Sequence, residues 1–258
     1  MAFELLLTAL VNAAVGLLIG WSGIAGFLLP MFYVGVLGLE VPAALTLSFA
    51  AFAVSGAIGA AGYYKQGNLP VKAALPLGLG SLAGAVLGVA LNALIPPGVV
   101  KVLLYVVVLA SGTSILLRER CAAKAPAADT STGKTPLDRP PLAAGLGFAT
   151  AVICALSGAG GPVLVMPLLV LLGLPVRWAI GVALFDSIFI ALPSVVGYGL
   201  QTGLSGLWPL LAAGCLAHAA GVLIGSRTCG AIPQRPLKIA VAVFSILIAL
   251  YMIFTMLL

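Results

Sequence analysis

The sequence predicts an all-α polytopic membrane protein made of two inverted-topology repeats, each with about five helical segments. Three observations lead to this fold class. Hydrophobic residues make up 62% of the chain and charged residues only 7%, whereas a soluble domain carries about 25% charged residues. Apolar runs close to the ~20 residues that span a bilayer recur from end to end. One polar stretch, residues 118–141, divides these runs into two halves of similar size.

The two halves match each other when Ser22 is aligned with Ser157, an alignment that we call the first register. The other pairs in this register are Gly23 and Gly158, Gly26 and Gly161, Gly38 and Gly173, Leu39 and Leu174, Gly62 and Gly197, Tyr63 and Tyr198, and Gln66 and Gln201. Further along, a short insertion gives a second register, which pairs Gly84, Gly88, Pro96 and Lys101 with Gly221, Gly225, Pro233 and Lys238. Because most matched residues direct the backbone, we expect an internal duplication. Its parts are an N-terminal repeat over residues 1–117, a polar linker over 118–141 and a C-terminal repeat over 142–258.

Each half contains five apolar segments. In the first half they are Ala2–Gly20, Phe27–Leu37, Pro42–Tyr64, Val71–Ile95 and Val99–Leu117. In the second half they are Leu142–Leu156, Pro162–Leu172, Val176–Leu200, Leu207–Gly225 and Pro236–Leu258. The second segment of each half has 11 residues, and a helix of that length covers about 16 Å, roughly half of the hydrocarbon core. We therefore expect it to form a broken, re-entrant helix pair with the segment before it.

Basic residues decide between this hairpin and a single broken crossing. With a hairpin in each half, 11 of the 12 Lys and Arg residues lie on one side of the membrane, and only Lys101 lies opposite. A single broken crossing would split the basic residues seven to five. The positive-inside rule favours the hairpin. It places the linker in the cytoplasm, both termini outside and the halves in inverted orientations, as in many secondary transporters.

A glycine-rich break separates the first two segments of each half. The first break contains Ser22, Gly23 and Gly26, and the second contains Ser157, Gly158, Gly160 and Gly161. A helix that begins after such a break offers free N–H groups and a partial positive charge, and glycine lets a ligand approach the backbone closely. Two matching breaks in inverted halves predict that these residues form one anion-binding site. The alternative is that such breaks serve only close helix packing, the role we assign to the glycines spaced by four at Gly80, Gly84 and Gly88, and at Gly221 and Gly225.

The motifs around the breaks resemble those of the sulfite exporter TauE/SafE family. The resemblance covers nearly the whole chain and rests on the paired halves, the SGxGG-type break followed by a proline and a short apolar helix, and the polar central loop. Its most specific part is Ser157–Pro167, "SGAGGPVLVMP", of which the first half has a shorter copy, "SGIAGFLLP". The resemblance implies transport of a small sulfur-containing or organic anion across the bacterial inner membrane. It does not define the substrate.

One aspartate and one histidine lie well inside predicted spans. Asp186 stands about ten residues into its span and is the one acidic residue placed deep in any of them. A buried acid in a membrane segment is a candidate functional residue, here a proton relay, and the alternative is a protonated structural Asp. His218, in the middle of the next span, either pairs with Asp186 in such a relay or packs as a structural residue. Tyr198, near the end of a span, is expected to anchor its helix at the membrane interface.

The sequence contains no pattern typical of a catalytic or metal site. No HExxH, GxxxxGK[ST] or GxSxG motif occurs, and the four cysteines show no CxxC spacing, so we interpret them as free thiols. The net charge of +6 is explained by membrane topology and gives no argument for nucleic-acid binding. We expect an exporter of a small anion, sulfite or an organosulfonate, that works in the lipid bilayer without cofactor or metal. The alternatives are an importer of carboxylates or other small anions, and an intramembrane enzyme.

Overall fold

The computed structural model of the protein describes residues 2–22, 25–122, 137, 139–203, 206–228 and 234–257. Over these residues the chain forms α-helices and no strand. The helices are α1 (Ala2–Ser22), α2 (Leu28–Gly35), α3 (Val41–Lys65), α4 (Val71–Leu94), α5 (Pro97–Ala122), α6 (Pro140–Ser157), α7 (Gly161–Leu171), α8 (Val176–Thr202), α9 (Trp208–Thr228) and α10 (Gln234–Leu257). Seven of the described helices are long and apolar enough to cross a membrane. The predicted all-α polytopic membrane fold is therefore confirmed, and each of the ten predicted apolar segments coincides, within a few residues at its ends, with one of the ten helices of the described residues.

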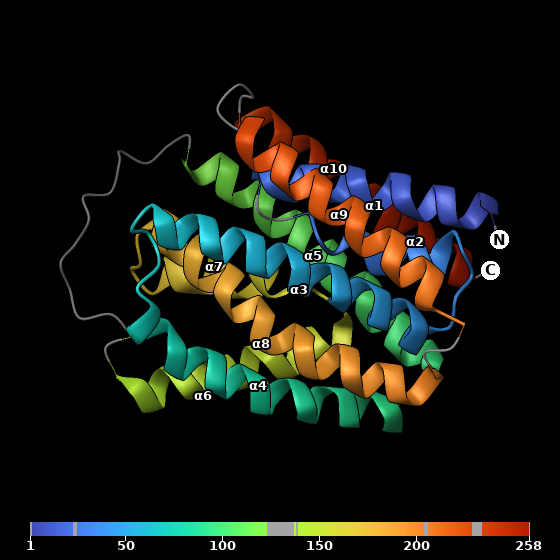
Figure 1. The fold of residues 1–258 in the computed structure, drawn as a ribbon, viewed down its shortest axis with the longest axis horizontal. Coiled ribbons are helices and arrows are strands. Elements are labelled where there is room, and N and C mark those ends of the chain that lie inside the picture. Colours follow the sequence, from blue (N-terminus) through green and yellow to red (C-terminus); the bar gives the residue numbers. More distant parts are fainter. Residues whose placement is uncertain are drawn as a thin grey trace.

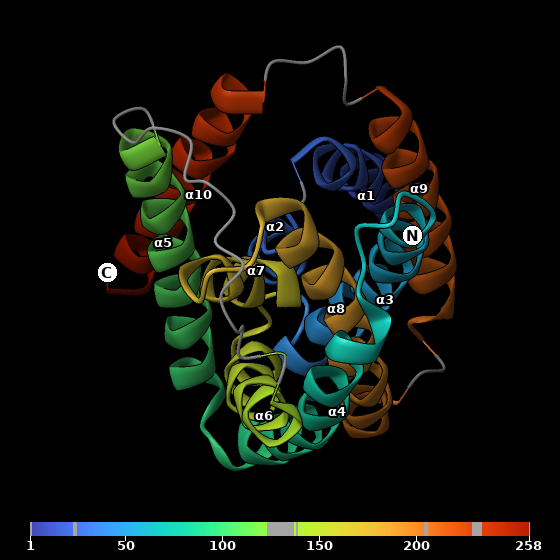
Figure 2. The ribbon, with the colours of Figure 1, turned by 90° about the vertical axis from the view of Figure 1, so that its left-hand side faces the viewer.

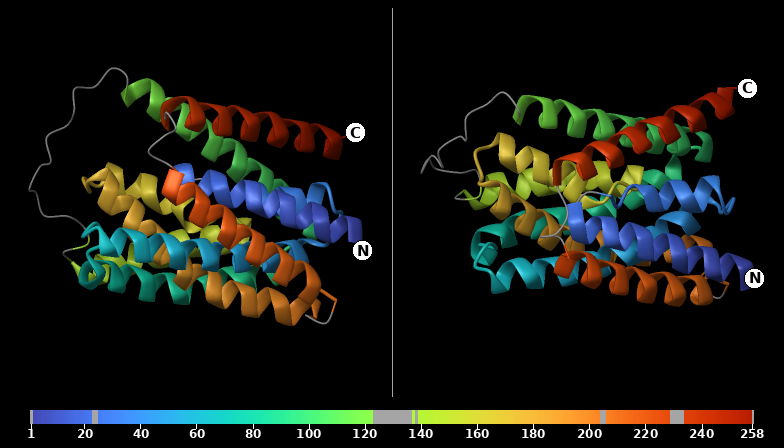
Figure 3. Two further views of the ribbon diagram at one scale, coloured as in Figure 1. Left: turned by 45° about the horizontal axis from the view of Figure 1, so that its top comes forward. Right: turned by 90° about the horizontal axis from the view of Figure 1, so that it is seen from above.

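The long helices lie along the long axis of the molecule, and their ends gather at two opposite faces (Figure 1 and Figure 3). Both labelled chain termini lie at one of these faces, where α1 begins. Helix α6 begins at the opposite face, so it runs against the direction of α1. This is the relation expected between the first helices of two inverted halves. The inverted duplication itself stays a prediction.

The two short helices, α2 and α7, lie inside the bundle with longer helices around them (Figure 2). Helix α2 has 8 residues and α7 has 11, so at about 1.5 Å per residue neither crosses the hydrocarbon core alone. Residues Leu28–Val34 of α2 are all buried. Each short helix leads back towards the face from which the preceding long helix starts (Figure 3). This arrangement agrees with the re-entrant pairs expected from the lengths of the apolar segments.

Helices of the first half pack mainly on helices of the second half. Helix α1 packs on α9, α4 on α6, α3 on α8 and α5 on α10. The contacts of α3 with α9 and of α4 with α8 connect these pairs to one another. The two halves are therefore interleaved in one structure and do not form separate bundles.

Glycines set the helix separation in two of these pairs. In α4, three glycines lie directly against the backbone of α6: Gly80, Gly84 and Gly88. A Cβ atom on Gly88 would lie 2.7 Å from the carbonyl oxygen of Val152, so only glycine allows the two backbones to approach this closely. In α9, the glycines that meet the backbone of α1 in the same way are Gly221 and Gly225. The packing role that we assigned to these glycines is confirmed.

The contacts of these two glycine-lined pairs are equivalent under the two registers that relate the halves. Gly84 and Gly88 face Phe148 and Val152, whereas Gly221 and Gly225 face Ala13 and Leu17. In the second register, Gly84 and Gly88 align with Gly221 and Gly225. In the first register, Ala13 and Leu17 align with Phe148 and Val152. This is the correspondence that a duplicated chain predicts.

Replacing Gly147 by valine should lower the stability of the protein, whereas the same change at Gly145 should not. A Cβ atom on Gly147 would collide with the carbonyl oxygen of Leu77 in α4 and lie 2.8 Å from the hydroxyl of Ser81. Overpacking of this kind costs about 1–3 kcal/mol. Gly145 precedes Gly147 in α6 and has open space around its Cβ position, so it is a matched control. The unfolding temperatures of the two detergent-solubilised variants check this, and equal values would contradict the α4–α6 packing.

Two expectations about the ends of the segments are corrected by the structure. Tyr198 does not lie at the membrane interface, because its side chain is fully buried and its hydroxyl donates a hydrogen bond of 2.8 Å to the carbonyl of Ala155. Its place near the end of a span did not reveal which face of the helix packs inward. Helix α5 continues to Ala122, past residue 118, where the linker was expected to begin. Residues 123–136 of that linker, predicted to be a flexible loop, lie outside the described residues.

Candidate functional site

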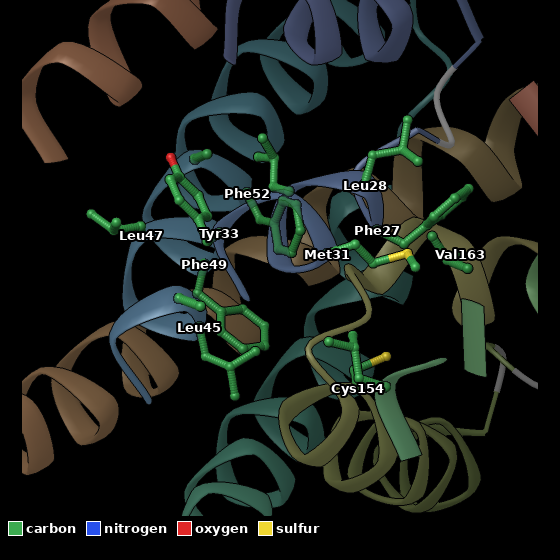
Figure 4. Close-up of a cluster of buried hydrophobic side chains, with 14 of the residues drawn as sticks. Phe27, Leu28, Met31, Tyr33, Leu45, Leu47, Phe49, Phe52, Cys154 and Val163 are labelled. Atoms are coloured by element: carbon green, nitrogen blue, oxygen red, sulfur yellow. The ribbon is translucent and has the colours of Figure 1, made fainter. Parts of the chain in front are cut away.

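The two glycine-rich breaks line one small cavity in the centre of the molecule. Gly26 comes from the first break and Gly160 from the second, and the cavity between them has a volume of about 20 Å³. The other residues that line it are Ile19, Phe52, Ser55, Pro162, Val163, Leu184 and Ser187. Buried side chains around Phe52, among them Phe49 and Met31, are drawn in Figure 4. Segments from opposite halves of the sequence are thus brought to the same place.

The second break is built by a glycine turn and a proline. Gly158 ends α6 with a φ of 71°, in the left-handed region that favours glycine. A Cβ atom there would also collide with the side chain of Leu45. Gly160 is extended, with φ −63° and ψ 145°, and Pro162 follows Gly161 in the first turn of α7, where its missing N–H costs no hydrogen bond. The chain therefore leaves α6 in a tight turn and enters α7 with that helix's N-terminus beside the cavity.

The N-terminus of α7 presents backbone donors at this place. The first N–H groups of a helix have no partner within the helix, and the amides of Gly160 and Gly161 have no backbone partner among the described residues. The aligned peptide dipoles add a partial positive charge to these donors. Such an end suits an anion without requiring a buried Lys or Arg.

The first break is described from residue 25 onward. Ser22 is the last residue of α1, and its side chain and Gly23 lie outside the described part of the chain. The amides of Leu28 and Leu29 bond to the carbonyls of Ala25 and Gly26 at 3.2 and 3.1 Å. These turns lead into α2, so Gly26 reaches the cavity just before the helix begins.

The glycines of the second break differ in what surrounds them. A Cβ atom on Gly160 would lie 3.5 Å from the ring of Phe52, which is an ordinary van der Waals distance on the cavity side. A Cβ atom on Gly161 would lie 3.1 Å from the Cβ of Ser187 and 3.2 Å from Ile190. Gly161 therefore allows α7 to pack closely on α8, and Gly160 is the glycine that borders the cavity.

Ser157 uses its hydroxyl within the break. The hydroxyl donates to the carbonyl of Ile153 at 2.7 Å and accepts a long hydrogen bond of 3.4 Å from the amide of Ala159. Because its proton is already used by α6, Ser157 stabilises the end of that helix in this conformation. It does not line the cavity, whereas Ser55 and Ser187 do.

Asp186 immediately precedes Ser187 in α8, on a different face of the helix, and it does not line the cavity. Its side chain is fully buried, and neither carboxyl oxygen has a hydrogen-bond partner among the described residues. Ser81 of α4 and Cys154 of α6 are close enough to interact with it electrostatically, but the hydroxyl of Ser81 is not placed for a hydrogen bond. A buried carboxyl group without a donor or a cation is costly in its charged form. The neutral acid is therefore the form that this conformation accommodates.

His218 belongs to a separate polar group between α9 and α1. Its Nδ1 atom lies 3.2 Å from the backbone carbonyl oxygen of Asn12. The side-chain amide of Asn12 in turn donates to the hydroxyl of Tyr33 at 2.7 Å and to the carbonyl of Thr8 at 2.9 Å. No hydrogen bond joins His218 to the carboxyl group of Asp186, so the pairing, one of the two alternatives considered from the sequence, is not formed in this conformation. Within the described residues there is also no group of three or more potential metal ligands.

The family model of the sulfite exporter TauE/SafE matches residues 6–252, nearly the entire chain. The chain belongs to the sulfite exporter TauE/SafE family. It is also similar to "Probable membrane transporter protein YdhB" of Bacillus subtilis (strain 168), with 25% identity over 252 residues that cover 96% of this chain and 100% of that protein. No solved structure matches it. As a TauE/SafE member the protein is a multi-pass membrane transporter, and membership in a transporter family implies that it is not an enzyme.

Sequence reasoning missed most of the residues of this TauE/SafE protein that line the cavity, among them Phe52, Ser55 and Ser187. All three stand inside long apolar helices, where nothing in the local pattern distinguishes them. The first register pairs Phe52 with Ser187. That pairing was a signal, because equivalent positions of two inverted halves face each other across a common centre.

Proposed function

We propose that this TauE/SafE protein exports a small anion, sulfite or an organosulfonate, across the bacterial inner membrane, and that the anion binds at the central cavity. One observation carries the proposal: Gly26 and Gly160, which precede two short helices from different halves, line the same buried cavity. The donors would be the backbone N–H groups of Gly160 and Gly161 at the start of α7, assisted by the helix dipole. Broken helices that meet near the midplane at a repeat interface are the usual site in transporters built from inverted repeats.

The size of the cavity supports a closed conformation. A volume of about 20 Å³ is enough for roughly one water molecule, and a sulfite ion has four non-hydrogen atoms. Transport therefore requires a conformation in which the space between the breaks is larger. The antiparallel directions of α1 and α6 and the equivalent glycine contacts support two inverted halves that move against each other.

The membrane potential supports export as the direction. A potential that is negative inside drives an anion outward by about 2.3 kcal/mol per charge per 100 mV. An importer of carboxylates or other small anions would use the same site against this potential and would need a coupled ion. The direction and the substrate are therefore decided by measured flux.

Flux through the purified protein in liposomes tests the proposed function. Vesicles loaded with sulfite, an alkylsulfonate or a dicarboxylate should release the sulfur oxyanions faster than protein-free vesicles when the inside is made negative. Faster movement of carboxylates would favour the alternative substrate class. Release no faster than from protein-free vesicles for every anion would overturn the proposal.

The direction of insertion gives a second prediction, that the termini face outward and residue 130 faces the cytoplasm. The reason is the concentration of basic residues on one side of the predicted topology. In a variant without native cysteines, a single cysteine at residue 130 should react with a membrane-impermeant thiol reagent only after cells are opened, and one at residue 2 should react in intact cells. The reverse pattern would contradict the orientation.

A further inference from the structure

We propose that Phe52 is the movable gate of the anion site and that its ring limits the size of the anion the site accepts. The inference rests on the proposed function, because it assigns a role within the same cavity. It is carried by the position of the ring, by the size of the cavity and by the residue that the other half places opposite.

The ring of Phe52 lies against both glycine-rich breaks. A Cβ atom on Gly26 would be 2.8 Å from its Cε1 atom, and one on Gly160 would be 3.5 Å from its Cδ2 atom. Gly160 immediately precedes α7, and Gly26 comes shortly before α2. The ring therefore lies between the two breaks and next to the start of α7, where the unpartnered amides of Gly160 and Gly161 are the donors for an anion. Its side chain is 3% exposed, so bulk solvent does not reach this place.

Phe52 is the residue whose movement would enlarge the site. The glycines have no side chain to withdraw, and Pro162 is fixed in the first turn of α7. Among the residues that line the cavity, Phe52 has the largest side chain. Rotation of the Phe52 ring away from Gly26 and Gly160 would add the volume of the ring to the cavity, which now has about 20 Å³. The anion would then contact the amides at the start of α7.

The two halves of the sequence contribute side chains of different size to the cavity. The residue equivalent to Phe52 in the first register is Ser187, and both line the cavity. The hydroxyl of Ser187 donates back to the carbonyl of Leu184 at 2.8 Å, so this side chain stays close to its own helix. One half thus supplies a bulky ring and the other leaves space for it. A single residue closes a site that both halves share.

Aromatic contacts connect the gate to the end of α6. Phe52 packs edge-on against Phe49 with ring centroids 5.7 Å apart, and Phe49 stacks on Tyr198 at 6.1 Å. The hydroxyl of Tyr198 donates a hydrogen bond to the carbonyl of Ala155, two residues before Ser157, where α6 ends. Movement of the Phe52 ring therefore changes the packing of groups that support the second break.

Flux with anions of different size tests the gate. In liposomes, Phe52→Ala should raise the release of benzenesulfonate relative to sulfite by at least about tenfold, the discrimination that small changes in pocket size can give. Phe52→Trp should slow the release of both anions. Phe189→Ala is the matched control, because Phe189 is a half-buried aromatic residue that contacts Gly78 of α4 and does not line the cavity. An unchanged ratio in Phe52→Ala would overturn the size limit.

Thiol access separates failure of the gate from failure of the proposed function. In a variant whose four native cysteines are replaced by alanine, a cysteine at Ser55 reports on the cavity and one at the buried Ser194 serves as control. Adding Phe52→Ala should speed the reaction of the first with a small permeant thiol reagent and leave the second unchanged. If the wild type moves no anion, the proposed function fails while this measurement still tests the gate. Equal reactivity at Ser55→Cys with and without the ring would overturn the gate itself.

Discussion

Gly160→Val should reduce anion flux to the level of protein-free vesicles while the protein still folds. The backbone at Gly160 has φ −63° and ψ 145°, a conformation that valine adopts without strain. The three atoms nearest to its Cβ position all belong to the ring of Phe52, at ordinary contact distances of 3.5–3.7 Å. The two methyl groups of valine would therefore extend into the cavity and cover the amides at the start of α7. The loss should affect every anion equally, because it removes the binding space itself.

Stability and a conservative variant make this result interpretable. The unfolding temperature of Gly160→Val in detergent should stay close to that of the wild type, since no backbone contact is broken. Gly160→Ala adds one methyl group and should retain part of the flux. Gly145→Val is the control for valine in a glycine position, because its Cβ position faces open space. Full flux in a folded Gly160→Val protein would contradict the placement of the anion.

Asp186→Asn should abolish the dependence of flux on a pH gradient without abolishing flux. An ionised Asp186, adjacent in sequence to Ser187 in α8, would repel an anion in the cavity, so we expect a proton to accompany the anion. Sulfite as a dianion keeps one net negative charge together with that proton, so the membrane potential still drives it outward. Wild-type flux should then be faster when the compartment that holds the anion is the more acidic, with about 1.4 kcal/mol available per pH unit and proton. The amide of asparagine stays neutral and has nearly the same shape. Flux through the variant should be the same at either sign of the gradient.

The surroundings of Asp186 decide which control variant the pH experiment needs. Among the described residues, Cys154 of α6 is the ionisable side chain recorded as interacting with it from a neighbouring helix, Ser81 contributes a hydroxyl from α4, and α7 contains no ionisable residue. The ionisable residues of α3, Tyr63, Tyr64 and Lys65, stand at the C-terminal end of that helix. Cys154→Ser is therefore the control, and it should keep the pH dependence. If the flux through the wild type does not depend on the pH gradient, Asp186 has a structural role only.

The helices and their breaks could be predicted because they depend on local composition. Each long helix follows an apolar run, and the short ones follow from Gly, Ser and Pro residues that interrupt such runs. The packing role of the glycines spaced by four in α4 and α9 could also be predicted, because this spacing places them on one face of the helix. These features do not require knowledge of which helices become neighbours.

The residues that line the cavity could not be predicted from the sequence, because they depend on which face of each helix points inward. Phe52 looks like any other aromatic residue of an apolar segment until α3 is packed beside both breaks. The same limit explains the error about Tyr198, and why the role of His218 was left open between pairing with Asp186 and packing. A polar residue in the middle of a span is readily located along the helix axis. Its partner depends on rotation about that axis, which an almost uniformly apolar sequence does not specify.

The pairing of α1 with α9 has a consequence for how the chain is made. Helix α1 ends at Ser22 and α9 begins at Trp208, and the glycines of α1, Gly16 and Gly20, are spaced to receive the backbone of α9. At a synthesis rate of about 5–20 residues per second, α9 leaves the ribosome roughly 10–40 s after α1. During this interval α1 lies in lipid without its partner. Insertion of the first helix and its packing are therefore separate events in biogenesis, and a ribosome that stops before α9 leaves a glycine-lined surface open to other membrane helices.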